Sequence, residues 1–196
     1  MNLLLATKNK GKIKEIRRLL EGQRVNILTL DDFPNVSLPK EDLATFKGNA
    51  LKKARFVAKK TGIQALSDDS GLCVNALGGR PGVISARYAG DNATDEENVE
   101  KLLEEMKDVP NGKRTASFVC VIAFVLPSGK GKTFEGRLEG TIAREPKGKG
   151  GFGYDPVFFL PGKGKTLAEL KPEEKNLLSH RGAALKKFKK NLPPLT

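Results

Sequence analysis

The sequence has little of several residue types: its 196 residues include no tryptophan, two cysteines and one histidine. Because Cys73 and Cys120 lie far apart and His180 is alone, a disulfide framework is excluded and a zinc site almost excluded. The longest apolar run, 116–126, is far shorter than the ~20 residues of a membrane-spanning helix. The start, 1–6, is too short for the apolar region of a secretory signal. We therefore expect a cytoplasmic protein whose cysteines are small buried side chains in a reducing compartment.

Positive charge is what the sequence has in excess. It contains 35 Lys and Arg against 23 Asp and Glu, a formal net charge of +12. Its 38% hydrophobic and 30% charged residues are typical of a soluble protein with one real core, so we expect a single domain spanning residues 1–196. The charge favours an anionic partner, but nucleic acid, an anionic membrane surface and a small polyphosphate all remain open.

Strand-like and helix-like segments alternate along the chain. Strands are expected at 2–6, 25–30, 63–66, 115–126, 132–143 and 157–160. Helices are expected from near Lys10, from Phe46 to Thr61-Gly62, after Thr94, and from near Pro172 until 191–194. Asn9 is a candidate cap for the first helix, and Thr94 with Glu97 forms a capping box for the third. This alternation predicts an α/β fold.

The first candidate site is a basic turn between a strand and a helix. It consists of Thr7, Lys8, Asn9, Lys10, Gly11 and Lys12. Free backbone N–H groups at a helix N-terminus can bind phosphate oxygens, and Asn9 and Lys12 add amide donors and a charge. A solvated lysine-rich turn is an equally good interpretation of this segment alone.

The second candidate is Lys53, which lies four residues after Asn49 and therefore on the same helix face. Small apolar neighbours, Ala50, Ala54 and Val57, indicate that its stem crosses half-buried ground. The ammonium could point into a cleft, but these residues by themselves favour a side chain that reaches solvent.

The third candidate is the acidic set Glu41, Asp68 and Asp69. We expect Ser67–Gly71 to form a polar turn at the C-terminal end of strand 63–66, where α/β sheets usually place their sites. One or two carboxylates with water and phosphate oxygens suit Mg²⁺, and a nearby carboxylate could take a proton from water. A turn that merely caps the strand is the alternative, and we favour the metal and base.

The fourth candidate pairs 152–155 with 179–181. Phe152 lies among glycines and could stack on a base, while Asp155, His180 and Arg181 could face a purine edge. Taken one at a time, Phe152 is better explained as a core residue and His180 as a surface helix residue.

Two phosphate-binding patterns fail. Gly131-Lys132-Thr133 and Gly164-Lys165-Thr166 lack the earlier glycine of a Walker A loop, because those positions hold Leu126 and Phe159. The glycines at 148, 150 and 153 match a dinucleotide fingerprint, but a strand-like segment follows them instead of a helix.

Six segments together resemble the inosine triphosphatase family, the pyrophosphatases for non-standard purine nucleoside triphosphates such as dITP and XTP. The segments, in the family's order, are 6–12, 45–54, 67–72, 78–90, 151–158 and 179–183. Each is weak alone, but six in order across nearly the whole chain are highly specific.

The resemblance implies hydrolysis of ITP, dITP and XTP to the monophosphate and pyrophosphate. It implies that Asp69 accepts a proton from the attacking water and that Glu41 and Asp69 hold Mg²⁺, with the share of Asp68 left open. Residues implied to contact the phosphates or sugar are Thr7, Lys8, Asn9, Lys10, Gly11, Lys12, Lys53 and Ser70. Residues implied to hold the base end are Phe152, Gly153, Tyr154, Asp155, Lys175, His180 and Arg181.

The resemblance also implies a homodimer and an α/β fold. The expected fold is a long mixed central β-sheet flanked by helices, with two lobes and the active-site cleft between them. Donors such as Arg181 and His180 would suit a purine 6-keto group and would stay unpaired against the 6-amino group of adenine.

Two other functions fit the sequence less well. A nucleic-acid-binding module would explain the +12 charge, but the aromatic residues do not interleave with the basic runs. A nucleotide kinase would need the phosphate loop that is lacking. We therefore expect a small-molecule substrate, with no membrane and no specific nucleic acid as partner.

Overall fold

The computed structural model describes residues 1–192. Within that range no helix is long and apolar enough to cross a membrane. The chain forms two compact units, each assembled from separate stretches of sequence. The first unit contains Met1–Asp69, Cys120–Gly136 and the chain from His180 on; the second contains Ser70–Val119 and Arg137–Ser179.

Seven strands form one mixed sheet in the order β2-β1-β3-β4-β5-β6-β7. The strands are β1 (Asn2–Leu5), β2 (Asn26–Leu28), β3 (Ala65–Val74), β4 (Thr115–Val125), β5 (Gly131–Ile142), β6 (Phe158–Leu160) and β7 (Lys165–Thr166). β1 pairs in parallel with β2 and β3, whereas β6 pairs antiparallel with β5 and β7. The main helices are α1 (Lys10–Leu19), α2 (Phe46–Thr61), α3 (Asp95–Glu105), α4 (Pro172–Leu178) and α5 (His180–Lys189). The predicted α/β class with a mixed central sheet is confirmed.

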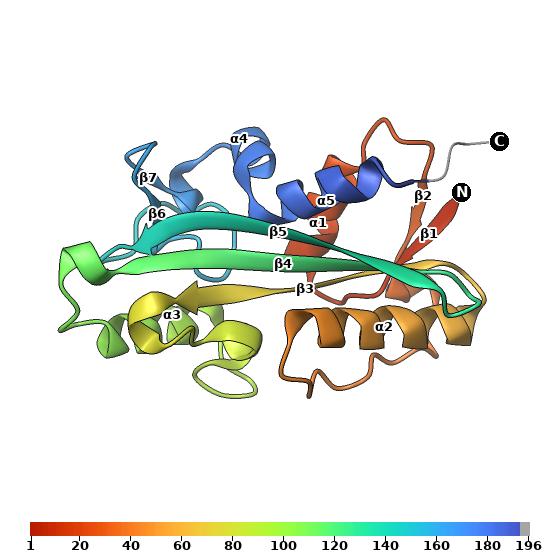
Figure 1. Cartoon of the computed structure of the whole chain (residues 1–196), viewed down its shortest axis with the longest axis horizontal. Coiled ribbons are helices and arrows are strands. Elements are labelled where there is room, and N and C mark those ends of the chain that lie inside the picture. Colours follow the sequence, from red (N-terminus) through yellow and green to blue (C-terminus); the bar gives the residue numbers. More distant parts are fainter. Residues whose placement is uncertain (193–196) are drawn as a thin grey trace. The chain divides into compact units, whose positions relative to one another are not determined.

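In the first unit, helices cover both faces of the sheet (Figure 1). The alternation of side chains along β1 shows how. Leu3 and Leu5 pack into a buried cluster with residues of α1 and α5, whereas Leu4 belongs to a second cluster with Ala54 and Val57 of α2. Residues next to one another in a strand of this unit therefore face different helices. The same alternation gives Asp68 and Asp69 of β3 different surroundings.

Local signals in the sequence position these helices. Asn9 caps α1 by accepting a hydrogen bond from the backbone N–H of Lys12 at 2.9 Å, and Thr45 caps α2 in the same way through Gly48. Gly136 in β5 lets α5 approach closely, because a Cβ at that position would overlap the backbone oxygen of His180. The start of α5 is thus held tightly against the sheet.

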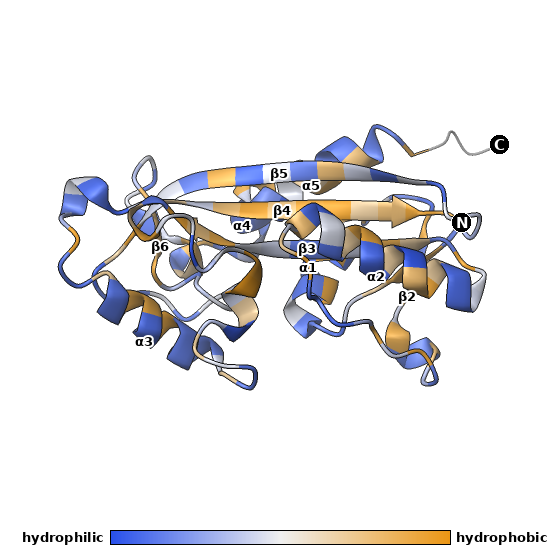
Figure 2. Cartoon of the chain, turned by 60° about the horizontal axis from the view of Figure 1, so that its bottom comes forward, coloured by the Kyte–Doolittle hydropathy of each residue, from blue (hydrophilic) through white to orange (hydrophobic). Residues whose placement is uncertain are grey.

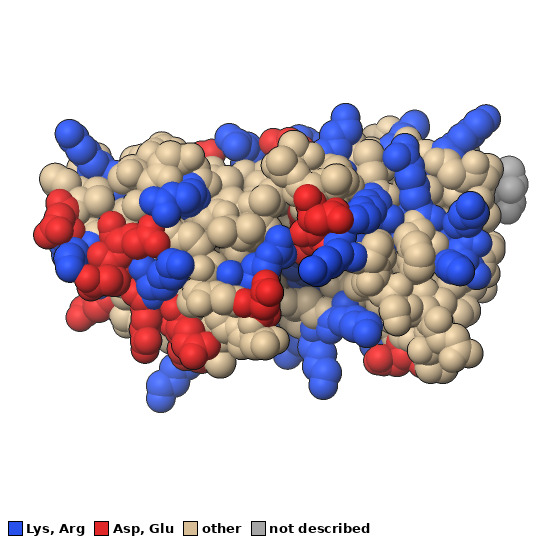
Figure 3. Space-filling model, turned by 90° about the horizontal axis from the view of Figure 1, so that it is seen from below, with Lys and Arg blue, Asp and Glu red and all other residues tan. Residues whose placement is uncertain are grey.

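The second unit has its own buried cluster, in which Leu72 of β3 and Leu102 of α3 pack with Tyr154 and Phe158. The predicted capping box of Thr94 and Glu97 opens α3. This helix carries the acids Asp95, Glu96, Glu97, Glu100, Glu104 and Glu105. Figure 3 shows acidic side chains gathered over this part of the unit, so the positive charge of the chain is unevenly distributed.

Hydropathy separates the two longest strands (Figure 2). β4 is hydrophobic along most of its length and almost wholly buried, as expected of a strand covered on both faces. β5 alternates between buried and exposed residues over much of its length, so one of its faces is more open.

Two predictions about local structure are wrong. Ser67–Gly71 is not a turn, because β3 continues to Val74 and both aspartates lie within the strand. The last predicted helix is two helices, since the extended backbone of Ser179 ends α4 before α5 begins. Its predicted end includes 193–194, which lie outside the described residues.

Candidate functional site

Asp68 and Asp69 occupy neighbouring positions in the middle of β3 and point to opposite faces of the sheet. Asp68 is fully buried, and Asp69 is 4% exposed. The contacts confirm the two directions: Asp68 binds Lys12 of α1 and Arg181 of α5, whereas Asp69 faces Lys53 of α2. Each carboxylate therefore has its own set of charged partners.

Asp68 is surrounded by donors. Arg181 donates from Nε to Asp68 Oδ2 at 2.8 Å, the Cys120 thiol donates to the same oxygen at 2.9 Å, and Lys12 forms an ion pair with Oδ1. Burial would raise the pKa of Asp68, but Arg181 and Lys12 more than offset it and hold the pKa well below its usual value. Asp68 is thus ionised at neutral pH and poorly suited to accepting a proton.

Asp69 is placed differently. Its Oδ1 lies 3.5 Å from Lys53 Nζ, and its buried Oδ2 has no hydrogen-bond partner within residues 1–192. Burial raises the pKa of Asp69 to about 6, against the opposing charges of Lys53 and Lys12. A carboxylate with this pKa is mainly ionised at neutral pH and is a competent proton acceptor.

Lys53 is buried, 3% exposed, so the interpretation of its side chain as reaching solvent is wrong. Its Nζ donates to the backbone oxygen of Asp68 at 2.8 Å and forms an ion pair with Glu41. Burial would lower the pKa of Lys53, but Asp69 and Glu41 outweigh it and raise the pKa. The apolar stem was recognisable in the sequence; the distant acids that hold the ammonium inside were not.

Asn49 explains how Glu41 reaches Lys53. The buried Asn49 side chain accepts from the backbone N–H of Leu43 at 3.0 Å and donates to the backbone oxygen of the same residue at 3.1 Å. These two bonds fix the loop before α2 against the helix. Asn49 therefore supports the loop that carries Glu41.

The segment Thr7–Lys12 does two structural tasks in addition to its predicted one. Asn9 caps α1, and the Lys12 ammonium is held by Asp68. Thr7, Lys8 and Lys10 line a cavity of about 440 Å³ together with residues from 29–36. The exposed lysines of this turn thus border an open space within the first unit.

In the second unit, the predicted residues 152–155 form an ordered loop around Asp155. The Asp155 carboxylate accepts from Lys175 Nζ at 2.6 Å and from the backbone N–H of Phe152 at 2.8 Å. The Lys175 ammonium also lies 4.9 Å from the centre of the half-buried Phe152 ring. Gly151 has a φ of +78°, and a Cβ there would collide with Asp155. The glycine permits this close approach.

Two further contacts hold the same loop. The backbone N–H of Gly153 donates to Asp95 at 2.6 Å, and the hydroxyl of the buried Tyr154 donates to the backbone oxygen of Ser85 at 2.8 Å. Phe152 therefore lies on the partly open side of a loop whose next two residues are tied down.

The structure places the predicted site residues in two groups. Glu41, Lys53, Asp69, His180, Arg181 and the segment Thr7–Lys12 belong to the first unit. Ser70, Phe152, Gly153, Tyr154, Asp155 and Lys175 belong to the second unit. His180 is 5% exposed, so its interpretation as a surface residue is wrong.

Three residues near these groups were not recognised from the sequence. Glu15 forms an ion pair with Arg181, Cys120 donates to Asp68, and Asp95 accepts from Gly153. Glu15 follows Lys12 by three residues, a helical spacing that could have linked the two. Cys120 fits the predicted buried cysteine, but it is a hydrogen-bond donor as well, and Cys73 is only half-buried.

The oxygens around Lys53 suit a hard cation. The carboxylates of Glu41 and Asp69 and the backbone oxygen of Asp68 converge on one ammonium. In the described part of the chain, no group of three or more His, Cys, Asp or Glu could hold a metal. Mg²⁺ often binds one or two carboxylates together with water and substrate phosphates, so the residues present fit it.

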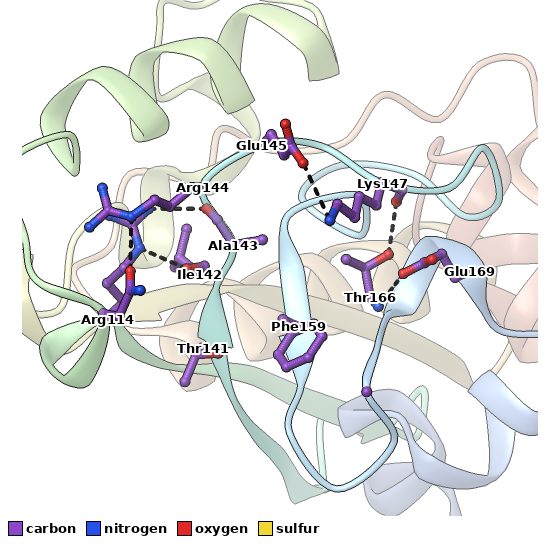
Figure 4. Close-up of a pocket in the computed structure, with 12 residues that line it drawn as sticks. Arg114, Thr141, Ile142, Ala143, Arg144, Glu145, Lys147, Phe159, Thr166 and Glu169 are labelled. Carbon is purple, nitrogen blue, oxygen red and sulfur yellow. Dashed lines mark hydrogen bonds and ion pairs between the residues drawn. The ribbon is translucent and has the colours of Figure 1, made fainter.

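A cavity of about 480 Å³ in the second unit is separate from both groups (Figure 4). Arg114 and Arg144 line it, but Arg114 Nε donates to the backbone oxygen of Ile142 and Arg144 Nε to the side chain of Asn111, both at 2.8 Å. None of the predicted site residues lines this cavity. Its charged side chains support the local structure.

Comparison with known proteins identifies the family. A dITP/XTP pyrophosphatase of Geobacter sulfurreducens is 54% identical over 190 residues, covering 97% of this chain and 96% of the relative. One from Bacillus subtilis is 47% identical over 189 residues, 96% of each protein. The solved structure of a HAM1 protein from Coxiella burnetii matches with a TM-score of 0.90 and 45% identity over 98% of both chains. Residues 3–191 match the Ham1 family, which confirms the predicted resemblance, and the chain belongs to that family.

Proposed function

We propose that this chain is a nucleoside triphosphate pyrophosphatase that hydrolyses ITP, dITP and XTP to the monophosphate and pyrophosphate. Full-length relatives named dITP/XTP pyrophosphatase, about half identical to it, support the reaction. The observation that carries the proposal is the surroundings of Asp69: a carboxylate with a raised pKa beside a buried lysine and a second acid. Together they provide a proton acceptor next to a site for a metal and phosphates.

We assign the reacting end of the substrate to the first unit. Asp69 accepts the proton of the attacking water, which must reach the α-phosphorus because pyrophosphate leaves. Glu41 and Asp69 would hold Mg²⁺, which when bound neutralises phosphate charge that grows in the transition state. The residues assigned to the phosphates and sugar are Thr7, Lys8, Asn9, Lys10, Gly11, Lys12, Lys53 and, from the second unit, Ser70.

We assign the base end to Phe152, Gly153, Tyr154, Asp155, Lys175, His180 and Arg181. The Phe152 ring offers a face for stacking. Lys175 and Asp155 bind each other, so their remaining donors and acceptors are fixed in direction before substrate arrives. The Arg181 guanidinium donates hydrogen bonds to Glu15 and Asp68, so its side chain also anchors β3. We further propose a cytoplasmic homodimer that has no specific nucleic acid partner.

The test is an analysis of phosphorus products. The purified protein is incubated with Mg²⁺ and, separately, ITP, XTP, GTP and ATP, and the products are separated and identified. We expect monophosphate and pyrophosphate, formed much faster from ITP and XTP than from GTP and ATP. Diphosphate and orthophosphate would overturn the site of cleavage. No turnover, with tight binding to RNA or DNA instead, would favour a nucleic-acid-binding module.

Neighbouring acids provide the control. Glu41→Gln removes one proposed metal ligand and should abolish most of the turnover. Asp42→Asn changes the next residue, an exposed acid that pairs with Lys52 at 2.6 Å, and should keep normal activity. Equal activity of the two variants would remove Glu41 from the site.

A further inference from the structure

The Lys53 ammonium occupies the point at which the two proposed metal ligands meet. It binds Glu41, lies 3.5 Å from Asp69 Oδ1 and donates to the backbone oxygen of Asp68 at 2.8 Å. These are three hard oxygens of the kind that Mg²⁺ prefers. Lys53 therefore holds the ligand set in the geometry of a cation site while itself serving as the cation.

A divalent ion and this ammonium would repel each other at the same carboxylates, and the repulsion is strong because the site is almost closed to water. Lys53 is 3% exposed and Asp69 is 4% exposed, so solvent screens the two charges little. Glu41, with a side chain that is 31% exposed, is the open edge of the group. A metal ion and the Lys53 ammonium would therefore compete for these carboxylates.

Charge supplies the reason for Lys53 to leave. Glu41, Asp69 and Lys53 together carry a net charge of about −1, and one Mg²⁺ would change it to about +1. An excess positive charge in a buried site is unfavourable until phosphate oxygens join it. Those oxygens also give the displaced ammonium a new partner.

We propose that Lys53 is an internal counter-ion that competes with Mg²⁺ for Glu41 and Asp69 and releases them when substrate phosphates attract its ammonium. The inference rests on the proposed function for the identity of the metal ligands. It makes Lys53 a positioning residue for the metal in the free protein and a phosphate ligand in the complex. Mg²⁺ alone should consequently bind weakly.

The test measures Mg²⁺ binding without nucleotide by titration calorimetry. Lys53→Met removes the competing charge and should bind Mg²⁺ about tenfold or more tighter than the wild type, a usual size for coupling between two ligands. Lys52→Met removes the neighbouring, partly exposed lysine, which pairs with Asp42, and should bind Mg²⁺ as weakly as the wild type. Lys53→Arg keeps the charge and should also bind weakly. Equal or weaker binding by Lys53→Met would overturn the inference.

A second measurement follows Lys53 in the wild type and covers the case in which Lys53→Met does not fold. In protein labelled with ¹³C at the lysine ε-carbon, saturating Mg²⁺ should move the Lys53 resonance toward that of exposed lysines. The spectrum of Lys53→Arg assigns that resonance. A Lys53 resonance that stays in place at saturation would contradict displacement.

These outcomes separate the two proposals. If the wild type hydrolyses ITP but Lys53 does not compete with Mg²⁺, only the exchange is wrong. If Lys53→Met binds Mg²⁺ tightly but the wild type hydrolyses none of the nucleotides, the competition between Lys53 and Mg²⁺ stands and the substrate assignment fails.

Discussion

Both units contain a buried acid paired with a buried base, but they build it in different ways. In the first unit, Asp68 lies within β3 and receives Lys12, Cys120 and Arg181 from two helices and a neighbouring strand. In the second unit, Asp155 lies in a loop that depends on glycine, and it accepts from Lys175 and from the backbone N–H of Phe152.

This difference corresponds to the two ends of the proposed substrate. A strand fixed by partners from three elements holds its side chains within narrow limits, which proton transfer and metal binding require. A loop fixed by an ion pair and by glycine conformation is easier to vary, and binding specificity is commonly carried by such loops. The strand that carries Asp69 should therefore control turnover, and the loop at 152–155 should control affinity for the base.

The largest effect is expected at the strand. Asp69→Asn removes the proposed proton acceptor and should lower kcat by about 10²–10⁴, the usual contribution of a positioned general base. The fold should remain intact, because Asp69 pairs with Lys53, which keeps its ion pair with Glu41 in the variant. The phosphorus product assay measures kcat, and a thermal melt measures the stability of the fold. Asp42→Asn is the control for both. Near-normal turnover would remove Asp69 from catalysis.

Substitution of Asp68, the residue before Asp69 in β3, should lower the stability of the fold. Asp68→Asn leaves the buried Arg181 and the largely buried Lys12 without their common anion, and breaking such an ion pair costs about 3–5 kcal/mol. Asp155→Asn removes the anion that Lys175 binds at 2.6 Å and should cost less. Urea unfolding of both variants and the wild type provides the comparison. A greater loss at Asp155 would reverse the ranking of the two regions.

Acidification should weaken the contribution of Asp68 to the stability of the first unit. Because the folded pKa of Asp68 is depressed, its contribution to stability is present above its unfolded pKa of about 3.9 and is lost as pH falls toward the lower folded value. The wild type should lose stability below about pH 4 more steeply than Asp68→Asn. If the free energy of unfolding falls equally steeply with pH in both proteins, Asp68 is not the source of the acid sensitivity.

The sequence predicted what depends on neighbours along the chain. The cap at Asn9, the capping box at Thr94 and the alternation of strands and helices all follow from local patterns, and each is present. β3 could not be predicted at its full length, because charged residues such as Asp68 and Asp69 are rare in strands. Arg181, which makes this burial tolerable, lies 113 residues away.

The division of the last helix was hidden for a related reason. Leu178, Gly182 and Leu185 keep helical spacing through Ser179, so the periodicity shows no interruption. Tertiary contacts decide the break: Gly136 admits the start of α5, and Asp68 binds its second residue, Arg181. The sequence itself singled out Lys53, the acidic set, the basic turn and the two segments of the fourth candidate, and the family resemblance added their expected roles. The contacts of Lys53 came only from the structure.

A smaller effect is expected at the loop of the second unit. Phe152→Ala removes a stacking face worth about 1–3 kcal/mol per base, and should raise KM for ITP more than it lowers kcat, because stacking is mostly uniform binding. Phe159→Ala, at a half-buried ring beside the separate cavity, is the control and should leave KM unchanged. A fall in kcat at constant KM would show that Phe152 acts at the reacting end.

The smallest effect tests how the loop is held. Asp95 and Glu96 are adjacent acids in the first turn of α3, where both complement the helix dipole, but only Asp95 is seen to accept from Gly153. Asp95→Ala should raise KM for ITP several-fold, since a lost hydrogen bond of this kind is worth about 1 kcal/mol. Glu96→Ala should leave KM unchanged while losing similar helix stability in a thermal melt. If the two variants have the same KM, Asp95 serves only the helix, and the loop owes its position to Asp155 and Tyr154.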